Sequence, residues 1–295
     1  MINWSQVKVG FLGGDEREEI LACHLQKLGA KVNVLGVPSW DIEGVLYKDL
    51  YKLISDSDII IGPMSGTDPQ GKLKAYFTEE PPVINKEFYK FLGPERLFLI
   101  GMLPKPVWEK AQDMDVQVIK TATLDQIAIP NAIPTAEGAI EIAIREREET
   151  IFSSKVLLIG LGRVGRTLGR RLLALGARVY GTARDETSLA WAQEMGIEVF
   201  SVEEMGKYIS EMELIINSAP AEVLTREFLE KLKAEALIID LASSPGGTDF
   251  ETADELGIRA ILALGLPGKV APKTAGKILA EVYPKIISEF WKRRG

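Results

Sequence analysis

The feature that most constrains this chain is a segment that occurs twice. Residues 7–36 (VKVGFLGGDEREEILACHLQKLGAKVNVLG) align without a gap with residues 154–183 (SKVLLIGLGRVGRTLGRRLLALGARVYGTA). Lys8 and Lys155 open the two copies, 147 positions apart. Each copy reads as an apolar strand, a glycine turn, a helix ended by glycine and a second strand, which is the beginning of a βαβ unit. Two such beginnings predict two α/β domains, each built on a largely parallel sheet.

The second copy carries a glycine pattern that is typical of phosphate binding. Gly160, Gly162 and Gly165 follow the predicted strand KVLLI with the spacing G-x-G-x-x-G. The first glycine permits a tight turn, the second a close approach to a pyrophosphate, and the third close packing of helix on strand. The first copy has Asp15 in place of Gly162 and Glu18 in place of Gly165. A carboxylate there would repel a pyrophosphate, so Asp15 is interpreted as a helix N-cap.

The end of the next predicted strand favours NADP over NAD. An acidic residue usually binds the ribose 2′-OH of NAD at this place, but no carboxylate occurs before Asp185. Arg184 and the Thr182 hydroxyl suit a 2′-phosphate instead, and Arg163 adds positive charge at the turn. NAD remains the alternative cofactor.

Small residues follow three further apolar runs, at 213–217, 236–241 and 259–263. Loops beyond the carboxyl ends of parallel strands line the ligand crevice, so we expect these loops beside the cofactor. The predicted cofactor-binding residues are Gly160, Gly162, Arg163, Val164, Gly165, Thr182, Arg184, Asn217, Ser218, Ala219, Pro220, Leu241 and Ala242.

The predicted fold is therefore α/β, with two Rossmann-like domains, of which the C-terminal one binds the dinucleotide. The expected boundaries are 1–132 for a substrate or partner domain, 133–150 for a connecting helix, 151–272 for the NAD(P)-binding domain and 273–295 for a helix crossing back. Asn131 is expected just before a helix that starts near Pro134, because proline suits the first helical turn. The substrate is expected in a cleft beside the nicotinamide.

Composition removes several classes of function. The 295 residues include 35 Lys and Arg against 42 Asp and Glu, a net charge of −7, which argues against nucleic-acid binding. The single histidine, His24, and single cysteine, Cys23, exclude an intrachain disulfide and a His/Cys metal site, and we predict no metal. Cys23 is expected to be buried, and His24 to be a surface or helix-packing histidine rather than a catalytic base. We find neither a signal peptide nor a membrane span, so we expect a cytoplasmic protein.

Five segments together resemble the A subunits of dipicolinate synthase, a family of spore-forming bacteria. They are GGDEREE, IPNAIPTAEGAIEIAI, VLLIGLGRVGRT, IIDLASSPGGTDF and GLPGKVAPKTAGKIL, and the resemblance extends over essentially the whole chain. It implies formation of pyridine-2,6-dicarboxylate in the mother cell during sporulation, from a dihydrodipicolinate-type intermediate of the lysine pathway. It also implies a partner, the flavoprotein-like B subunit. Glu18 departs from the resemblance, because a polar amide is expected after Arg17.

A dicarboxylate substrate requires positive charge and hydrogen-bond donors. The predicted substrate-binding residues are Arg17, Ser65, Gly66, Asn131, Thr135, Ser243, Lys269 and Lys273. Glu137 is the candidate proton acceptor, and Asn131 and Ser65 complete the predicted catalytic set.

Two alternatives stay open. The chain could be a non-catalytic nucleotide-binding scaffold of the B subunit, since no residue is a clear acid or base. It could instead be another NAD(P)-dependent acid dehydrogenase, although the 2-hydroxy-acid enzymes commonly need a histidine that the second half of this chain lacks. Association into a homo-oligomer is also left open.

Overall fold

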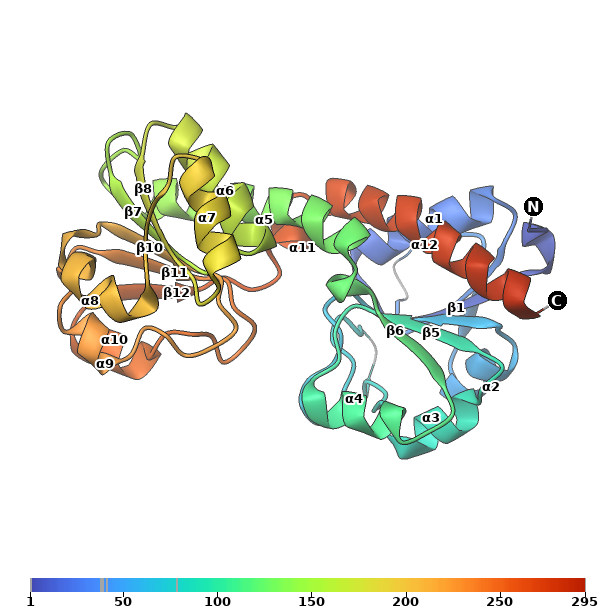
Figure 1. Cartoon of the computed structure of the whole chain (residues 1–295). Coiled ribbons are helices and arrows are strands. Elements are labelled where there is room, and N and C mark those ends of the chain that lie inside the picture. Colours follow the sequence, from blue (N-terminus) through green and yellow to red (C-terminus); the bar gives the residue numbers. More distant parts are fainter. Residues whose placement is uncertain (1, 38–39, 41, 78, 295) are drawn as a thin grey trace. The chain divides into compact units, whose positions relative to one another are not determined.

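The computed structural model describes residues 2–37, 40, 42–77 and 79–294. The chain divides into two compact units: unit 1 comprises residues 1–130 and 271–295, and unit 2 comprises residues 131–270. Each unit contains one six-stranded sheet in which every neighbouring pair of strands is parallel (Figure 1). The predicted α/β class with two parallel sheets is confirmed.

The sheet of unit 1 has the strand order β3-β2-β1-β4-β5-β6. Its strands are β1 (Lys8–Leu12), β2 (Lys31–Leu35), β3 (Val45–Tyr47), β4 (Ile59–Ile61), β5 (Leu97–Ile100) and β6 (Gln117–Lys120). The helices of unit 1 are α1 (Glu16–Lys27), α2 (Leu50–Ser55), α3 (Lys86–Leu92), α4 (Lys105–Gln112) and α12 (Pro272–Arg294), with 3-10 turns at Trp4–Gln6 and Thr121–Thr123. Strands β4 and β5 are entirely buried, as expected for a parallel sheet that helices cover on both faces.

The sheet of unit 2 has the order β12-β11-β10-β7-β8-β9. Its strands are β7 (Lys155–Ile159), β8 (Arg178–Thr182), β9 (Glu198–Phe200), β10 (Leu214–Asn217), β11 (Leu237–Asp240) and β12 (Arg259–Leu262). Its helices are α6 (Arg163–Ala174), α7 (Glu186–Glu194), α8 (Met205–Tyr208), α9 (Arg226–Leu229), α10 (Phe250–Glu255) and α11 (Leu266–Val270), with 3-10 turns at Val202–Glu204 and Ile209–Glu211. Helix α5 (Asp125–Glu146) joins the units.

The repeated sequence is also a repeated backbone geometry. After β1, the N–H of Gly13 donates to the carbonyl of Leu35 at 2.8 Å. After β7, the N–H of Gly160 donates to the carbonyl of Thr182 at 2.9 Å. These two bonds join pairs of residues that lie at the same offset in the sequence, so each first strand turns into its helix in the same way.

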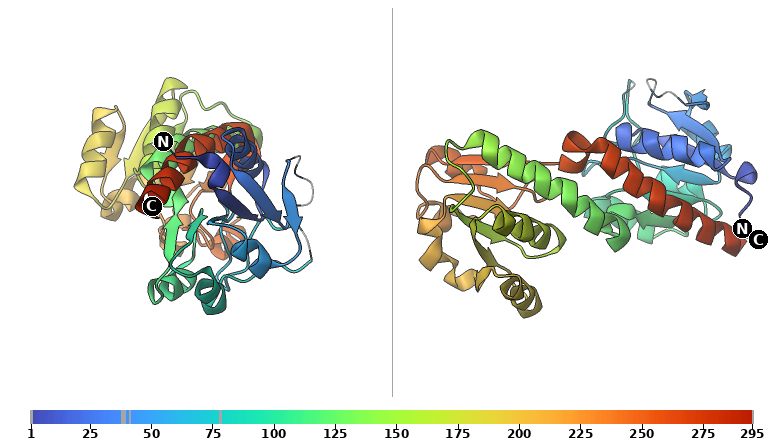
Figure 2. Two further views of the ribbon diagram at one scale, coloured as in Figure 1. Left: turned by 90° about the vertical axis from the view of Figure 1, so that its right-hand side faces the viewer. Right: turned by 90° about the horizontal axis from the view of Figure 1, so that it is seen from above.

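Helix α12 packs on unit 1 although it follows unit 2 in the sequence. It runs alongside α1 (Figures 1 and 2), and Leu279, Tyr283 and Ile287 are buried in the same core as β1 and β2. A Cβ on Gly276 would lie 2.8 Å from the Ile20 side chain, so glycine allows the two helices to approach closely. The core of unit 1 therefore includes residues from both ends of the sequence.

Helix α5 is longer than predicted. The prediction that it starts near Pro134 is wrong, because it begins at Asp125 and includes Pro130 and Asn131. Each proline removes one backbone hydrogen bond from the helix. The first turns of α5 form nevertheless, because they place Ile127 fully in the core of unit 1.

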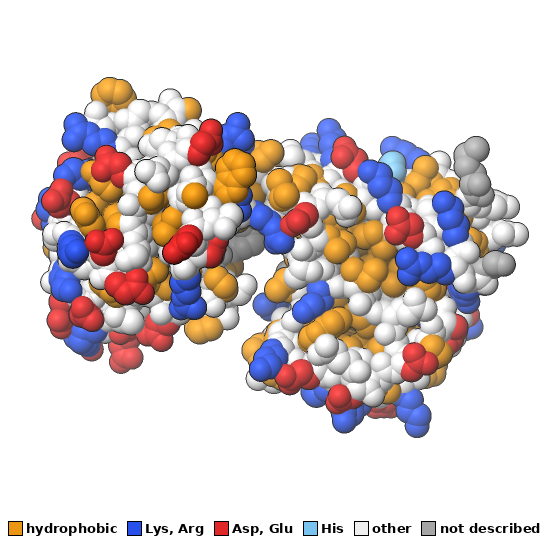
Figure 3. All heavy atoms as spheres, in the orientation of Figure 1, with side chains coloured by type: hydrophobic (Ala, Val, Ile, Leu, Met, Phe, Trp, Pro, Cys, Tyr) orange, Lys and Arg blue, Asp and Glu red, His pale blue; other side chains and the backbone are white. Residues whose placement is uncertain are grey.

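The surface carries charges of both signs. Figure 3 shows Lys and Arg side chains intermingled with Asp and Glu on the face in view. Within the described residues, none of the helices has the length and the apolar character needed to span a membrane.

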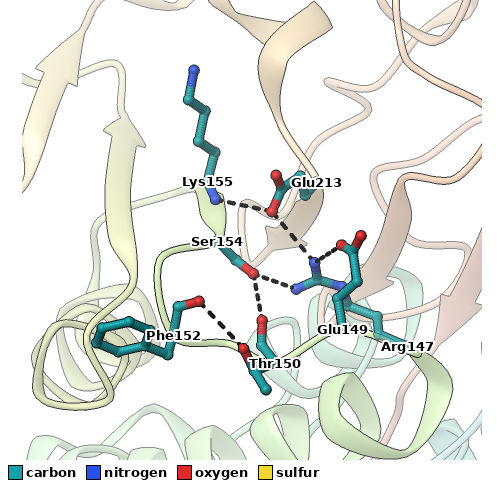
Figure 4. Close-up of polar contacts among 7 residues, drawn as sticks. All are labelled: Arg147, Glu149, Thr150, Phe152, Ser154, Lys155 and Glu213. Atoms are coloured by element: carbon teal, nitrogen blue, oxygen red, sulfur yellow. Dashed lines mark hydrogen bonds and ion pairs between the residues drawn. The ribbon is translucent and has the colours of Figure 1, made fainter.

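A buried arginine holds the connection between α5 and β7 (Figure 4). The Arg147 side chain is 6% exposed, donates to Ser154 Oγ at 3.1 Å, and pairs with Glu149 and Glu213 at 3.2 and 3.4 Å. Glu213 also accepts the N–H of Lys155 at 3.3 Å. The arginine, the first residue after α5, thus joins this end of the helix to the residue before β7 and the residue before β10.

Replacing Arg147 with alanine should lower the free energy of unfolding by about 2 kcal/mol, because the bonds to charged groups are lost from a buried position. The matched control is Arg294→Ala in unit 1. Arg294 pairs with Asp58 at 2.8 Å but is 38% exposed, so its loss should cost less than about 1 kcal/mol. Urea unfolding measures both variants, and equal losses would contradict the role of Arg147.

Candidate functional site

The turn between β7 and α6 has the geometry of a phosphate site. Gly160 has φ of +88°, which favours glycine, and a Cβ on Gly165 would lie 2.0 Å from the Gly160 carbonyl oxygen. Gly162 is the N-cap of α6, and apart from Gly162 and its two chain neighbours no described residue has an atom within 4 Å of the place its Cβ would take. Helix α6 therefore begins beside open space, as a pyrophosphate requires.

The loop after β10 lies against this turn. Ser218 Oγ donates to the Gly160 carbonyl at 3.0 Å, and the N–H nitrogen of Ala219 lies 3.0 Å from where a Gly160 Cβ would stand. Pro220 follows and is exposed. Two of the predicted cofactor-binding residues, Ser218 and Ala219, thus border the glycine turn.

The end of β8 presents a positive charge. Arg184 is exposed, whereas Thr182 is fully buried with a hydroxyl that has no hydrogen-bond partner among the described residues. Asp185 is the N-cap of α7, and its carboxylate accepts the N–H of Ser188 at 2.8 Å. The bond to that N–H lowers the pKa of Asp185. The nearest carboxylate after β8 is therefore already engaged in capping a helix.

Asp240 is a buried residue of this site that our sequence reasoning missed. Its carboxylate, fully buried at the end of β11, accepts hydrogen bonds from Asn217 Nδ2 at 3.1 Å, Ala242 N at 2.9 Å, Gly247 N at 2.8 Å and Thr248 Oγ1 at 2.7 Å. It therefore fixes the loop after β11 and the side chain at the end of β10. The sequence feature that points to Asp240 is its place as the one charged residue of the otherwise apolar strand LIID.

The other predicted residues near β7 have mixed exposure. Leu241 donates its N–H to the Asn217 carbonyl at 2.8 Å and is half-buried, as is Val164 on α6. Arg163 and Ser243 are exposed. The structure brings the predicted cofactor-binding residues together at the carboxyl end of one sheet.

Several predicted substrate residues lie on α5 and α11 of unit 2. Thr135 Oγ1 donates to the Asn131 carbonyl at 2.8 Å, and Asn131 Oδ1 is buried without a hydrogen-bond partner among the described residues. Glu137 is exposed and lies 3.9 Å from Arg171. Lys269 is exposed on α11.

Arg17 and Asp15 form a close pair at the start of α1 in unit 1. Asp15 caps α1 as predicted, accepting the N–H of Arg17 at 3.0 Å. The same carboxylate accepts Arg17 Nε at 2.8 Å and Nη2 at 2.7 Å, and Arg17 is only 8% exposed. Asp15 engages Nε and Nη2 and leaves Nη1 to donate elsewhere. Lys273 is exposed on the first turn of α12.

Glu18 connects this helix start to the loop after β4. It is 1% exposed, accepts the N–H of Asp15 and the N–H of Met64, each at 2.8 Å, and has a pKa that burial raises to about 7. Next to Met64, the Ser65 hydroxyl is buried and has no partner among the described residues. Gly66 follows with φ of +70°. The sequence suggested no such role for Glu18, because its partner Met64 is distant along the chain.

The corresponding turn in unit 1 is filled by the chain itself. The N–H of Gly14 donates to the Ala75 carbonyl at 2.7 Å, and a Cβ on Gly36 would lie 2.0 Å from the ring of Tyr76. Gly36 and Ala183 are equivalent in the sequence repeat. Tyr76 therefore covers Gly36, the residue of unit 1 that is equivalent to Ala183, just after β8 in unit 2.

The single histidine and cysteine lie in a shallow groove on unit 1, between α1 and α12. His24 and Cys23 line it with Lys27 and Lys277 among others. Cys23 is half-buried, so the prediction that it is buried is wrong, because its position on α1 borders this groove. Within the described part of the chain, no group of three or more His, Cys, Asp and Glu side chains could hold a metal ion.

Two known families match the two halves of the chain. Residues 8–122 match the N-terminal domain of the A subunits of dipicolinate synthase, and residues 136–245 match the NAD binding domain of D-isomer specific 2-hydroxyacid dehydrogenases. The A subunit of dipicolinate synthase from Bacillus subtilis (strain 168) is 35% identical over 292 residues, which cover 98% of each chain.

Solved structures agree with these matches. The crystal structure of the A subunit of dipicolinate synthase from Bacillus subtilis superposes with a TM-score of 0.87 at 35% identity and covers 99% of both chains. The crystal structure of the same subunit from Bacillus halodurans has a TM-score of 0.85 at 37% identity and covers 95% of this chain and 97% of its own. D-lactate dehydrogenase from Escherichia coli, with a TM-score of 0.68 at 13% identity, shares the fold.

Two glycine substitutions should distinguish a glycine that leaves space for a ligand from one that the packing of the turn requires. Gly162→Ala meets open space and should keep the free energy of unfolding within about 0.5 kcal/mol, while it weakens dinucleotide binding. Gly165→Ala meets a carbonyl oxygen at 2.0 Å and should cost about 1–3 kcal/mol. Urea unfolding and calorimetric titration with NADP measure the two effects. Equal stabilities of the two variants would contradict this geometry.

Proposed function

Because the chain belongs to the family of dipicolinate synthase A subunits, we propose that it oxidises a dihydrodipicolinate-type dicarboxylate to dipicolinate with NADP as hydride acceptor. The observation that carries this proposal is the open turn at Gly162, where α6 begins beside the exposed Arg184 strand end. The proposed reaction is the branch of the lysine pathway that supplies dipicolinate in sporulation. The proposed partner is the flavoprotein-like B subunit.

The reaction removes a hydride and a proton from a dihydropyridine ring, and aromatisation of the product favours it. The bound nicotinamide supplies the hydride acceptor. The chain's own residues bind and orient the substrate and exclude water from it. In unit 1, Arg17 Nη1 and Ser65 Oγ are the proposed donors to a substrate carboxylate; in unit 2, Asn131 and Lys269 are. Glu137, an exposed carboxylate, is the proposed proton acceptor.

The preference for NADP is proposed from two residues after β8. Arg184 is exposed and can pair with a 2′-phosphate, whereas the Asp185 carboxylate is engaged with the N–H of Ser188. A guanidinium gives charge-assisted hydrogen bonds to phosphate that a ribose hydroxyl does not match.

Arg184→Ala should raise the Kd for NADP by about tenfold to a hundredfold and leave that for NAD nearly unchanged, because one charged hydrogen-bond partner of the 2′-phosphate is lost. Calorimetric titration measures both constants. Arg178→Ala, at the opposite end of the same strand, is the control with the same change of charge. An equal loss for both nucleotides in Arg184→Ala would exclude the 2′-phosphate assignment.

Turnover is tested by mixing the purified chain with enzymatically generated dihydrodipicolinate and NADP, with and without the B subunit. Dipicolinate and NADPH should both appear, and their ultraviolet absorbance reports each product. Tight binding of NADP with no turnover in either mixture would overturn the enzymatic proposal and favour the scaffold alternative.

A further inference from the structure

We propose that Glu18 is a positioning residue, whose carboxylate holds the loop of residues 62–67 and with it the Ser65 hydroxyl. The bond from the Met64 N–H to Glu18 Oε1 is 2.8 Å long and buried. The other oxygen, Oε2, accepts the Asp15 N–H at the start of α1, also at 2.8 Å. One side chain therefore ties the loop after β4 to the capped end of a helix.

The side chain of Met64 is held from the other side. Its sulfur lies 3.5 Å from Thr121 Oγ1 and 3.7 Å from Tyr283 Oη, and these two oxygens are 2.8 Å apart. Ser65, the next residue, has a buried hydroxyl without a partner among the described residues. Because the Met64 backbone is held in place, the neighbouring Ser65 hydroxyl is held in place as well. The inference rests on the proposed function in taking this hydroxyl as a donor to substrate.

Only a carboxylate satisfies both backbone donors. Glutamine has one acceptor oxygen, and its NH₂ group would face the other N–H, which would be left without an acceptor. Protonation of Glu18 has a related effect, because the protonated oxygen accepts poorly. The charged groups that face Glu18 are Asp15 and Arg17 on its own helix start. The titratable group that faces it from α12 is Tyr283, whose pKa burial raises, so its phenol stays neutral.

The pH dependence separates the local bond from overall stability. Burial raises the pKa of Glu18 to about 7, above its ordinary value. Protonation of Glu18 therefore stabilises the folded chain at acidic pH. This contribution to the free energy of unfolding is lost as the pH rises through about 7. The Met64 bond changes in the opposite direction, because it is strongest when Glu18 is ionised.

Hydrogen exchange of the full chain tests the hold on the loop. At about pH 8, Glu18→Gln should speed exchange of the Met64 amide by about tenfold, while Glu16→Gln, an exposed residue on the same helix turn, should leave it unchanged. In the natural chain, protection corrected for intrinsic rate should fall between about pH 8 and about pH 6. This second measurement decides the matter even if Glu18→Gln does not fold. Unchanged protection in either measurement would overturn the proposal.

Kinetics test whether Glu18 acts through Ser65. Glu18→Gln and Ser65→Ala should each raise KM for the dihydropyridine dicarboxylate by about fivefold with kcat nearly unchanged, and the double variant should add nothing further. Additive effects would overturn action through Ser65. If exchange responds to Glu18→Gln but Ser65→Ala leaves KM unchanged, the Ser65 part of the proposed function fails and the positioning of the loop stands.

Discussion

Buried carboxylates that accept backbone N–H groups organise the loops at the carboxyl ends of the strands in each unit. Glu18 does so in unit 1 with the N–H groups of Asp15 and Met64, and Asp240 does so in unit 2 with those of Ala242 and Gly247. Loops that leave the carboxyl ends of parallel strands expose N–H groups that require partners. One carboxylate provides two strong acceptors, so it can fix segments that no regular structure joins.

The two copies of the repeat show how one backbone plan acquires different roles. Their first strands turn into helices through equivalent hydrogen bonds. In unit 2 the turn is left open at Gly162, whereas in unit 1 the chain covers it with Ala75 and Tyr76. In unit 1 the space at this turn is therefore restricted by more than the carboxylate of Asp15. A loop inserted after β4 fills the corresponding space.

Local patterns in the sequence were sufficient for the sheets and the glycine turn. A strand, a turn and a helix within one short segment, such as that around Gly160, are determined by residues that are close in the sequence. The local pattern is therefore enough to predict them. The start of α5 was mispredicted because prolines disfavour a helix locally, while burial of Ile127 in a distant core outweighs them. The bond between Glu18 and Met64 joins residues far apart in sequence, which no local pattern reports.

The return of α12 to unit 1 has a consequence for how the chain is made. Unit 2 is one continuous stretch, so all of its residues have been synthesised before α12 exists. Unit 1 lacks Leu279, Tyr283 and Ile287 until α12 leaves the ribosome. During synthesis the first unit to be translated is therefore the last to complete its core, and its apolar α1 face stays uncovered for that interval.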